Sequence, residues 1–442
     1  MSSSATFIDI RINNAEQLKE SVSEPSPNTK MYLAYGRVEP WANDLDPQIA
    51  NSSIATTYEL WDNMIGAKRL YGSDFMHGLP RFNWSYGETY TAYDNLNSNL
   101  FDGNTKFYIM NADFSVYKCL SNNYSRPSTV EPISVNPFIV TTTSDGYIWK
   151  FMYNISDSEQ IRFTTPSYIP VKHLTTDDGS LQYRVQDNAE DGAIHNIIVI
   201  DSGTGYTDPT NTTITITGDG TSATGYPTVN TLSNSVNAVV ITDQGSGYTF
   251  ASVTINAPVG TGANLRAIIS PPGGHGSNPV YELGGSNIII NGRIRYDEEG
   301  VLPVNNEYRQ ICLLKDPLIK GTANTLSDSA FLQALTLVCV GAGDYQDDEF
   351  VYQGTSLSDS TFSGRVVSWN PTTSKLFLIN TRGSPTASRS IIGSTSFTVR
   401  VLASVTSETA EKHSGRILYS DNIEPITRAS DQIEDFKIVV RM

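Results

Sequence analysis

The feature that most constrains this fold is an internal repeat near residues 192–271. The segment Ile197–Tyr206 (IIVIDSGTGY) recurs as Ala238–Tyr248 (AVVITDQGSGY), with an offset of 42 residues from Gly203 to Gly245. Each copy then continues into an alternating strand, Thr213–Ile216 or Ser252–Ile255. The repeat unit is a strand, a glycine turn with a tyrosine, and a second strand, which predicts a small β module that packs against itself. Its glycine turns have no following lysine and open no helix, so we interpret them as tight turns and not as nucleotide loops.

Most of the remaining chain is predicted as short strands between turns rich in Gly, Asn, Asp and Pro. The clearest strands are 31–36, 106–110, 116–120, 146–151, 288–290, 307–314 and 436–440. Residues near 336–404 hold further short alternating strands, which predict a small barrel or sandwich inserted between two framework strands. We therefore expect a mainly β (α+β) fold, a multi-domain β-sandwich framework with few helices and inserted small β modules.

At 442 residues the chain exceeds one ordinary core, and two to four domains are the general expectation. We expect three framework parts and two insertions. The framework parts are 1–190, 276–325 and 406–442. The insertions are the repeat module, 191–275, and the barrel-like segment, 326–405, with a linker expected at Pro271–Gly276.

Helices are expected at two places. Leu60, Trp61, Met64 and Ile65 recur at helical spacing, and Thr56 with Glu59 forms a capping-box pattern, so a helix is predicted over 58–70. A short helix is predicted over 14–22, after an alternating strand over 7–12.

Charge and cysteine content exclude several classes of function. The formal net charge is −16 and no basic run occurs, which argues against binding to nucleic acid or to an anionic membrane. Three cysteines, Cys119, Cys312 and Cys339, lie far apart without a CxxC pair, so we expect buried free thiols. No stretch has the pattern of a signal peptide or a membrane span.

No motif in the sequence predicts an active site. The five histidines show no HxH, HExxH or HxxxH spacing, and no GxSxG elbow is present. Carboxylates are abundant, but no pair stands out as the two acids of a glycosidase. The absence of a motif does not exclude an enzyme, but it leaves no residue as a candidate for catalysis, and we predict no cofactor, no metal and no small-molecule substrate.

A set of short motifs follows one order along the chain. It consists of YGRVEPW at 35–41, LWDNMIG at 60–66, VYKCL at 116–120, DGYIW at 145–149, YRQI at 308–311 and HSGRILY at 413–419, with Asn422 and Pro425-Ile426 after it. In this order they resemble the baseplate wedge protein of T-even-type contractile-tailed bacteriophages, the gene product eight family. The resemblance covers roughly 31–190, 285–320 and the chain from about 408. It covers neither the repeat nor the segment near 336–404, which look like added β insertions.

This resemblance implies a structural protein of the virion, located in the tail baseplate and assembled in the host cytoplasm. It implies a homodimer that contacts other wedge proteins around a central hub, without catalysis. The residues carried over as structural or interface positions are Gly36, Arg37, Glu39, Pro40, Trp41, Trp61, Met64, Arg309, His413, Ser414, Gly415, Tyr419, Asn422 and Pro425.

The residues Arg37, Glu39 and Trp41 can also be interpreted from their own chemistry. Arg37 and Glu39 on one strand face can pair, and Trp41 can anchor a buried contact. These residues serve either as a folding motif that joins strand to loop or as a direct interface. The net negative charge leads to one more hypothesis. Electrostatic repulsion would keep free subunits apart until a basic patch on a partner docks.

Two other functions remain open at this point. The chain could be a host-surface adhesin whose repeat displays Tyr206 and Tyr248 for stacking on polysaccharide. It could also be a tail-associated glycosidase, although no residue pair is singled out for that chemistry.

Overall fold

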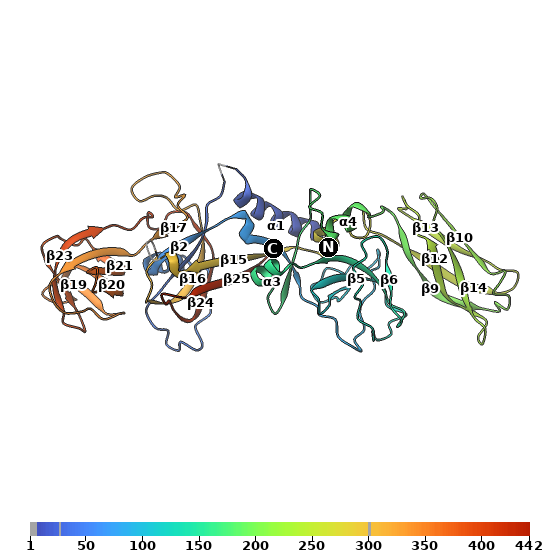
Figure 1. The fold of residues 1–442 in the computed structure, drawn as a ribbon, viewed down its shortest axis with the longest axis horizontal. Helices are drawn as coiled ribbons and strands as arrows, with labels where there is room; N and C mark the ends of the chain where they lie inside the picture. The colour runs from blue at the N-terminus through green and yellow to red at the C-terminus, as the bar shows by residue number, and fades with distance from the viewer. Residues whose placement is uncertain (1–6, 26–27, 299–301) are drawn as a thin grey trace, which may run out of the picture. The chain divides into compact units, whose positions relative to one another are not determined.

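The computed structural model describes residues 7–25, 28–298 and 302–442 (Figure 1). Strands make up 42% of the chain and helices 12%, which confirms a mainly β, multi-domain fold with few helices. The chain divides into two compact units, each built from separate stretches. The first unit comprises Met1–Gln17, Met76–Ile289 and Val439–Met442, and the second comprises Leu18–Phe75 and Ile290–Ile438.

The first unit contains an antiparallel sheet whose strands are rich in aromatic residues. Its order is β4-β5-β7-β6, with bounds Tyr108–Met110, Ser115–Ser121, Ile148–Asn154 and Thr141–Thr142. Tyr147 stacks on Trp149, with ring planes 14° apart, and both side chains are buried. Short helices belong to the same unit: α3 (Asp157–Phe163), α4 (Leu181–Asp187) and α5 (Pro279–Leu283).

A further four-stranded sheet has the order β25-β15-β3-β8. Its strands are β3 (Phe75–Pro80), β8 (Tyr168–Val171), β15 (Asn287–Arg295) and β25 (Ile433–Arg441). Within the first unit, β3 and β8 pair antiparallel from His77 opposite Val171 to Pro80 opposite Tyr168. Gly78 lies so close to β15 that an added Cβ would be 2.7 Å from Cγ1 of Ile289, so a larger residue there would displace β15.

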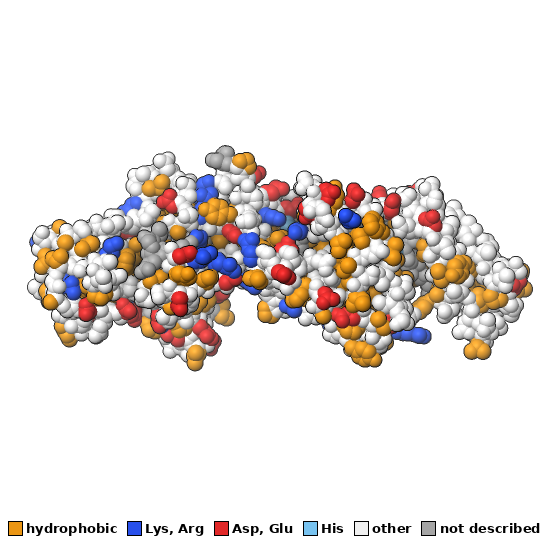
Figure 2. All heavy atoms as spheres, viewed as in Figure 1, with side chains coloured by type: hydrophobic (Ala, Val, Ile, Leu, Met, Phe, Trp, Pro, Cys, Tyr) orange, Lys and Arg blue, Asp and Glu red, His pale blue; other side chains and the backbone are white. Residues whose placement is uncertain are grey.

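The repeat forms one module in which each copy pairs with the other. The first copy gives β9 (Ile194–Thr204), β10 (Thr213–Gly218) and β11 (Thr224–Asn230); the second gives β12 (Ser235–Asp243), β13 (Ala251–Asn256) and β14 (Thr261–Ile269). One sheet has the order β10-β13-β14-β9 and the other is the pair β11-β12. All pairs except β13 with β14 join strands of different copies. Figure 2 shows few charged side chains on the visible face of this module.

The two repeat tyrosines exchange places between the copies. Tyr206 packs on Gly260 of the second copy, and its hydroxyl accepts a hydrogen bond from the N–H of Ala263 at 3.3 Å. Tyr248 packs on Gly220 of the first copy, and its hydroxyl accepts from the N–H of Ala223 at 3.4 Å. Both tyrosines are buried, at 3% and 5% exposure. The expected display of these two rings for polysaccharide binding is therefore wrong, because they form the core that joins the copies.

The second unit is built on a five-stranded sheet with the order β17-β2-β1-β16-β24. The bounds are Ala330–Leu332, Met64–Leu70, Met31–Gly36, Glu307–Lys315 and Arg416–Thr427. We call it the motif sheet. All six residues of β1 are buried, as expected of a central strand covered on both faces. Helix α2 (Ile54–Asn63) supplies Leu60 and Trp61 to its core.

The segment predicted as a small barrel or sandwich is a closed six-stranded barrel of the second unit. The strand order is β18-β21-β20-β19-β22-β23, with bounds Leu335–Val340, Lys375–Gly383, Ser360–Asn370, Phe350–Gly354, Ser390–Gly393 and Val399–Thr406. Alternate residues such as Leu376 and Leu378 point into its core and are fully buried.

Three local predictions need correction. Residues 7–12 do not form a strand, because helix α1 spans Ile8–Ser23 and includes the helix predicted over 14–22. Ile12, Ala15 and Val22 are buried at helical spacing, whereas Ile10 is 55% exposed.

The helix predicted over 58–70 ends at Asn63, and Met64 begins strand β2. The N-cap is Ser53, whose hydroxyl accepts from the N–H of Thr56, so the expected cap at Thr56 is wrong. Tertiary pairing explains the early end, because β2 pairs with β1 from Leu70 opposite Met31.

The linker expected at 271–276 is also wrong. The side chain of His275 is buried, and the N–H of Gly276 donates to Glu282 at 2.6 Å. This turn is packed within the first unit and holds a charged cluster described below.

Candidate functional site

The fourteen residues predicted as structural or interface positions lie on the motif sheet or in the segments that join its strands. Gly36 ends β1, Arg37 to Trp41 follow it, Trp61 and Met64 lie at the junction of α2 with β2, and Arg309 lies on β16. His413 to Gly415 precede β24, which carries Tyr419, Asn422 and Pro425. Residues up to about 390 positions apart in sequence therefore meet around one sheet of the second unit.

The turn after β1 depends on close backbone approach. A Cβ added to Gly36 would lie 2.1 Å from the carbonyl oxygen of Asn63, so only glycine fits there without a shift. Arg37 follows in the left-handed region at φ 63°, and its N–H donates to the same Asn63 oxygen at 2.9 Å. The end of β1 is thereby fixed to the end of α2.

Arg37 and Trp41 pack on each other. The guanidinium carbon of Arg37 lies 3.8 Å from the centroid of the Trp41 ring. Arg37 forms an ion pair with Glu59 at 2.8 Å and the expected pair with Glu39 at 3.7 Å. Trp41 is 8% exposed, and its indole N–H donates to the carbonyl oxygen of Ile423 on β24 at 3.1 Å. Both side chains are thus used inside the chain, as in a folding motif.

Arg309 holds the loop that follows Trp41. Its guanidinium donates to both carboxylate oxygens of Asp44 at 3.1 Å, and to the carbonyl oxygen of Val38 at 2.8 Å. It also pairs with Glu307 at 2.9 Å. The hydrogen bonds from Arg309 lower the pKa of Asp44, so this carboxylate stays ionised.

The same loop is also held by Asn422. Its amide donates to the carbonyl oxygen of Gln48 at 2.8 Å, while its oxygen accepts from Gln310 at the same distance. We call residues 42–53 the anchor loop. Beside these two fixed residues, Asp44 and Gln48, it presents Leu45 and Ile49, which are 80% and 94% exposed.

The HSG motif shapes the entry to β24. Gly415 has φ 68°, and an added Cβ would lie 2.4 Å from the carbonyl oxygen of Lys315. The Ser414 hydroxyl accepts from the N–H of Leu318 and donates to the carbonyl oxygen of Glu411. The ring of His413 lies edge-on to Tyr58, with centroids 4.7 Å apart. These contacts are again structural.

Two further motif residues lie on β24, the edge strand of the sheet. The Tyr419 hydroxyl donates to Asp421 at 3.1 Å. Pro425 lies where the pairing with β16 shifts register, between Asn422 and Ile426. An edge strand tolerates proline because the missing N–H interrupts no continuous ladder.

Sequence reasoning missed a buried ion cluster in the first unit, consisting of Lys118, Glu282 and His275. The Nζ atom of Lys118 lies 2.5 Å from Oε2 of Glu282, and Nδ1 of His275 lies 3.1 Å from the same oxygen. Lys118 also lies 3.8 Å from the centroid of the Tyr93 ring. The only signal was a lysine within an apolar strand run, VYKCL; its partner is 164 residues away.

Burial and mutual charge shift the pKa values in this cluster. Burial, with repulsion from Lys118, lowers the pKa of His275 to about 4. Burial alone would raise the pKa of Glu282, but Lys118 and His275 hold it at about 2. The cluster therefore contains a lysine–glutamate ion pair beside a neutral histidine at neutral pH.

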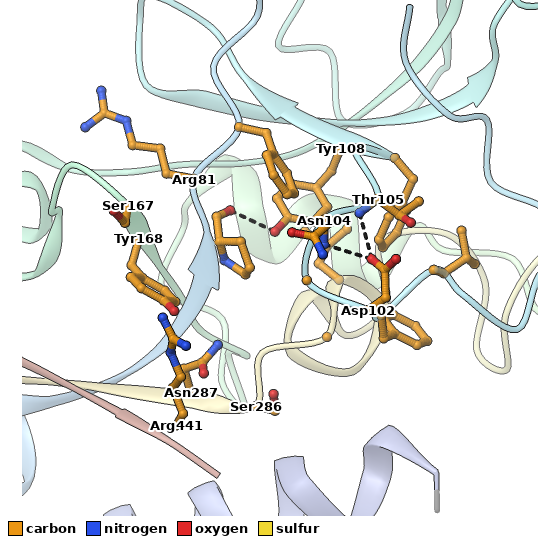
Figure 3. Close-up of a pocket in the computed structure, with 18 of the residues that line it drawn as sticks. Arg81, Asp102, Asn104, Thr105, Tyr108, Ser167, Tyr168, Ser286, Asn287 and Arg441 are labelled. Atoms are coloured by element: carbon orange, nitrogen blue, oxygen red, sulfur yellow. Dashed lines mark hydrogen bonds between the residues drawn. The ribbon is translucent and has the colours of Figure 1, made fainter. Parts of the chain in front are cut away.

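The first unit also has a pocket of about 570 Å³, which we call the arginine pocket (Figure 3). Its wall includes the ends of β3 and β25, the starts of β8 and β15, and the loop 100–107. Among the residues that the structure describes, Arg11, Arg81 and Arg441 line it together with one acid, Asp102. No residue of this pocket belongs to the motifs singled out from the sequence.

The three cysteines are buried free thiols, as expected. In the part of the chain that the structure describes, no group of three or more His, Cys, Asp or Glu residues is arranged to hold a metal ion. Among the same residues, no helix has the length and apolar character needed to cross a bilayer.

The chain matches no protein-family model and no curated protein.

Proposed function

We propose that this protein is a structural subunit of a contractile phage tail, in the baseplate wedge, and acts by docking to other subunits. The observation that carries the proposal is the convergence of four of the six ordered motifs on one sheet, while VYKCL and DGYIW belong to the β4-β5-β7-β6 sheet of the first unit. Four residues of these motifs, Arg37, Trp41, Arg309 and Asn422, make contacts that join α2, β1, β16 and β24. These residues come from separate segments and were chosen for their resemblance to wedge proteins.

The anchor loop gives this framework a docking surface. Asp44 and Gln48 are held by Arg309 and Asn422, while Leu45 and Ile49 stay exposed. Large exposed apolar side chains on a fixed backbone favour association, since little entropy is lost when they become buried. We assign this loop to the contact between two copies of the chain, and the remaining surface to other wedge proteins.

Solution mass tests the dimer and the loop separately. Sedimentation equilibrium is expected to give twice the 48.4 kDa chain mass. The double variant Leu45→Ser, Ile49→Ser is expected to shift the protein to monomer. A matched control, Leu96→Ser with Leu232→Ser, removes two exposed leucines of the first unit and is expected to stay dimeric.

A wild-type monomer at tens of micromolar would contradict the dimer. A dimer that survives the loop double variant would instead place the contact elsewhere. The wedge assignment is tested on purified phage particles by cryo-electron microscopy with an antibody fragment against the barrel. Density at the baseplate is expected; label on the capsid, or no label, would overturn the assignment.

The adhesin alternative loses its named residues, because Tyr206 and Tyr248 are buried between the repeat copies. No observation favours the glycosidase alternative.

A further inference from the structure

The arginine pocket combines positive charge, aromatic rings and uncharged hydrogen-bonding groups. It lies within the first unit, and its volume of about 570 Å³ falls in the range of small-ligand sites. Its residues come from parts of the chain more than 400 positions apart, from Arg11 to Arg441.

Charge is the first argument. The chain carries 46 acidic and 30 basic side chains, yet this pocket is lined by three arginines and one acid. That acid, Asp102, accepts from the N–H groups of Asn104 and Thr105 at 2.8 and 2.7 Å, and these bonds lower its pKa. Its carboxylate is therefore engaged by its own loop and leaves the pocket with a positive excess.

The arginines have different roles. Arg81 donates to the carbonyl oxygen of Thr165 at 3.1 Å and to Asn83, and in Figure 3 it points away from Arg441. It stabilises the rim. Arg441 lies beside Asn287, with its guanidinium carbon 5.9 Å from the centroid of the Tyr168 ring. Arg11, tied by Nε to the backbone oxygen of Met442, adds a second cation.

The lining also contains aromatic rings and uncharged polar groups, which suit the C–H groups and the hydroxyl groups of a sugar ring. Phe82, Phe101 and Tyr168 offer aromatic rings, whose negative faces attract the weakly positive C–H groups on one side of a sugar ring. Ser167, Asn104 and Ser286 add hydroxyl and amide groups that suit sugar hydroxyls. A peptide carboxylate would use Arg441 but would leave this polar lining without partners.

We infer that the arginine pocket binds a carboxylate-bearing sugar, as one unit of an acidic polysaccharide, with Arg441 on the carboxylate and Tyr168 on the ring. This site stands apart from the motif sheet and does not rest on the proposed wedge function. It implies binding without turnover.

The experiment uses the full chain with D-glucuronic acid as ligand. D-glucose, which has the same ring without the carboxylate, is the neutral comparison. Saturation-transfer NMR is expected to show binding of glucuronic acid at millimolar concentration and none of glucose. Arg441→Gln is expected to weaken binding about ten- to hundredfold, the range for a charge-assisted hydrogen bond. Arg184→Gln, an exposed arginine of α4 outside the pocket, is the matched control and is expected to bind like the wild type.

A second variant, Tyr168→Leu, separates a sugar site from a simple anion site. It is expected to weaken glucuronic acid binding and to leave any binding of inorganic sulfate unchanged. The inference is overturned if glucuronic acid does not bind, if glucose binds equally well, or if Arg441→Gln and Arg184→Gln behave alike. It is also overturned if sulfate or a short polyglutamate peptide displaces glucuronic acid and Tyr168→Leu has no effect. Thermal unfolding checks that each variant is folded.

Discussion

The first unit buries a lysine–glutamate pair beside a neutral histidine, whereas the second buries an arginine–glutamate pair among backbone carbonyls. The side chains of Lys118 and Glu282 are 0% and 3% exposed, and those of Arg428 and Glu434 have the same values. Arg428 shares its donors between Glu434, Tyr35 and the carbonyl oxygens of Pro303 and Arg295. Lys118 contacts Glu282, Nδ1 of His275 at 3.1 Å and the face of the Tyr93 ring.

The two glutamates respond in opposite directions. Lys118 and His275 hold the pKa of Glu282 at about 2, but burial raises the pKa of Glu434, more than Arg428 lowers it. Oε2 of Glu434 has no hydrogen-bond partner among the described residues. Equal exposure therefore does not give equal pKa shifts, because Glu282 is close to Lys118, His275 and the N–H of Gly276, whereas the side chain that pairs with Glu434 is Arg428.

The largest effect is expected from removing the lysine. Lys118→Met leaves Glu282 ionised and buried, and is expected to lower the free energy of unfolding of the first unit by about 3–5 kcal/mol at pH 8. Urea unfolding followed by pulsed hydrogen exchange measures each unit separately. Arg428→Met is expected to cost the second unit less, because Glu434 takes up a proton more easily.

A matched double variant sharpens this test. Lys118→Met with Glu282→Leu removes both charges and is expected to recover most of the lost stability. A loss below about 1 kcal/mol for Lys118→Met alone would show that the pair is not a stabilising contact.

The next effect is a difference in acid sensitivity. The pKa of His275 is about 4 in the folded state and 6.5 as its ordinary value, so the unfolded chain takes up the proton first as the pH falls. The stability that this histidine contributes is complete above pH 6.5 and is lost as the pH falls to 4, by on the order of 3 kcal/mol. Glu282 continues the loss between pH 4.5 and 2.

In the second unit Glu434 acts in the opposite sense. Its raised pKa means that the folded state binds the proton more tightly, so this group favours folding as the pH falls below its folded pKa. Urea midpoints from pH 8 to 4 should therefore fall more steeply in the first unit, and His275→Gln should flatten that slope. Parallel slopes in both units would refute the assignment.

A smaller and local effect is expected at the anchor loop. Arg309→Lys keeps the charge but loses the two-point contact with Asp44, which costs about 1–2 kcal/mol. Hydrogen exchange at residues 42–53 should rise in this variant while exchange of β16 stays slow. The control is Arg293→Lys, because Arg293 forms an exposed ion pair with Asp435 in the same unit.

The smallest effect is expected at an exposed pair of the first unit. Lys106 pairs with Glu88 near solvent, and Lys106→Met should change stability by about 0–0.5 kcal/mol. A change comparable to that of Lys118→Met would mean that burial is not what separates the two lysines.

Much of the fold could be predicted from the sequence because strands with one buried face alternate apolar and polar residues. The repeat, the barrel near 336–404 and most framework strands were found from alternation and turn residues. Helix α1 was partly missed, because Ile8, Ile10 and Ile12 alternate like a strand although only tertiary packing decides which of them is buried. Strand β2 was missed since its pairing with β1 overrides the helical spacing of Met64 and Ile65.

The candidate sites also differ in how far the sequence could predict them. The motif residues could be selected because each lies in a short distinctive run, and the resemblance supplied their order. Their contacts could not be predicted, since Trp41 meets Ile423 across 382 residues. The buried ion cluster and the arginine pocket have no local signature, because each combines ordinary residues from distant segments.

The crossed pairing of the repeat copies means that neither copy can fold alone as it does in the module. A chain with one copy would leave β9, β10 and β11 without their partners, and two such chains would have to supply strands to each other. Joining both copies in one chain replaces that obligate pair with a single folded module. Each tyrosine then depends on the glycine turn of the opposite copy, so a side chain added at Gly260 or Gly220 would disturb the other half of the module.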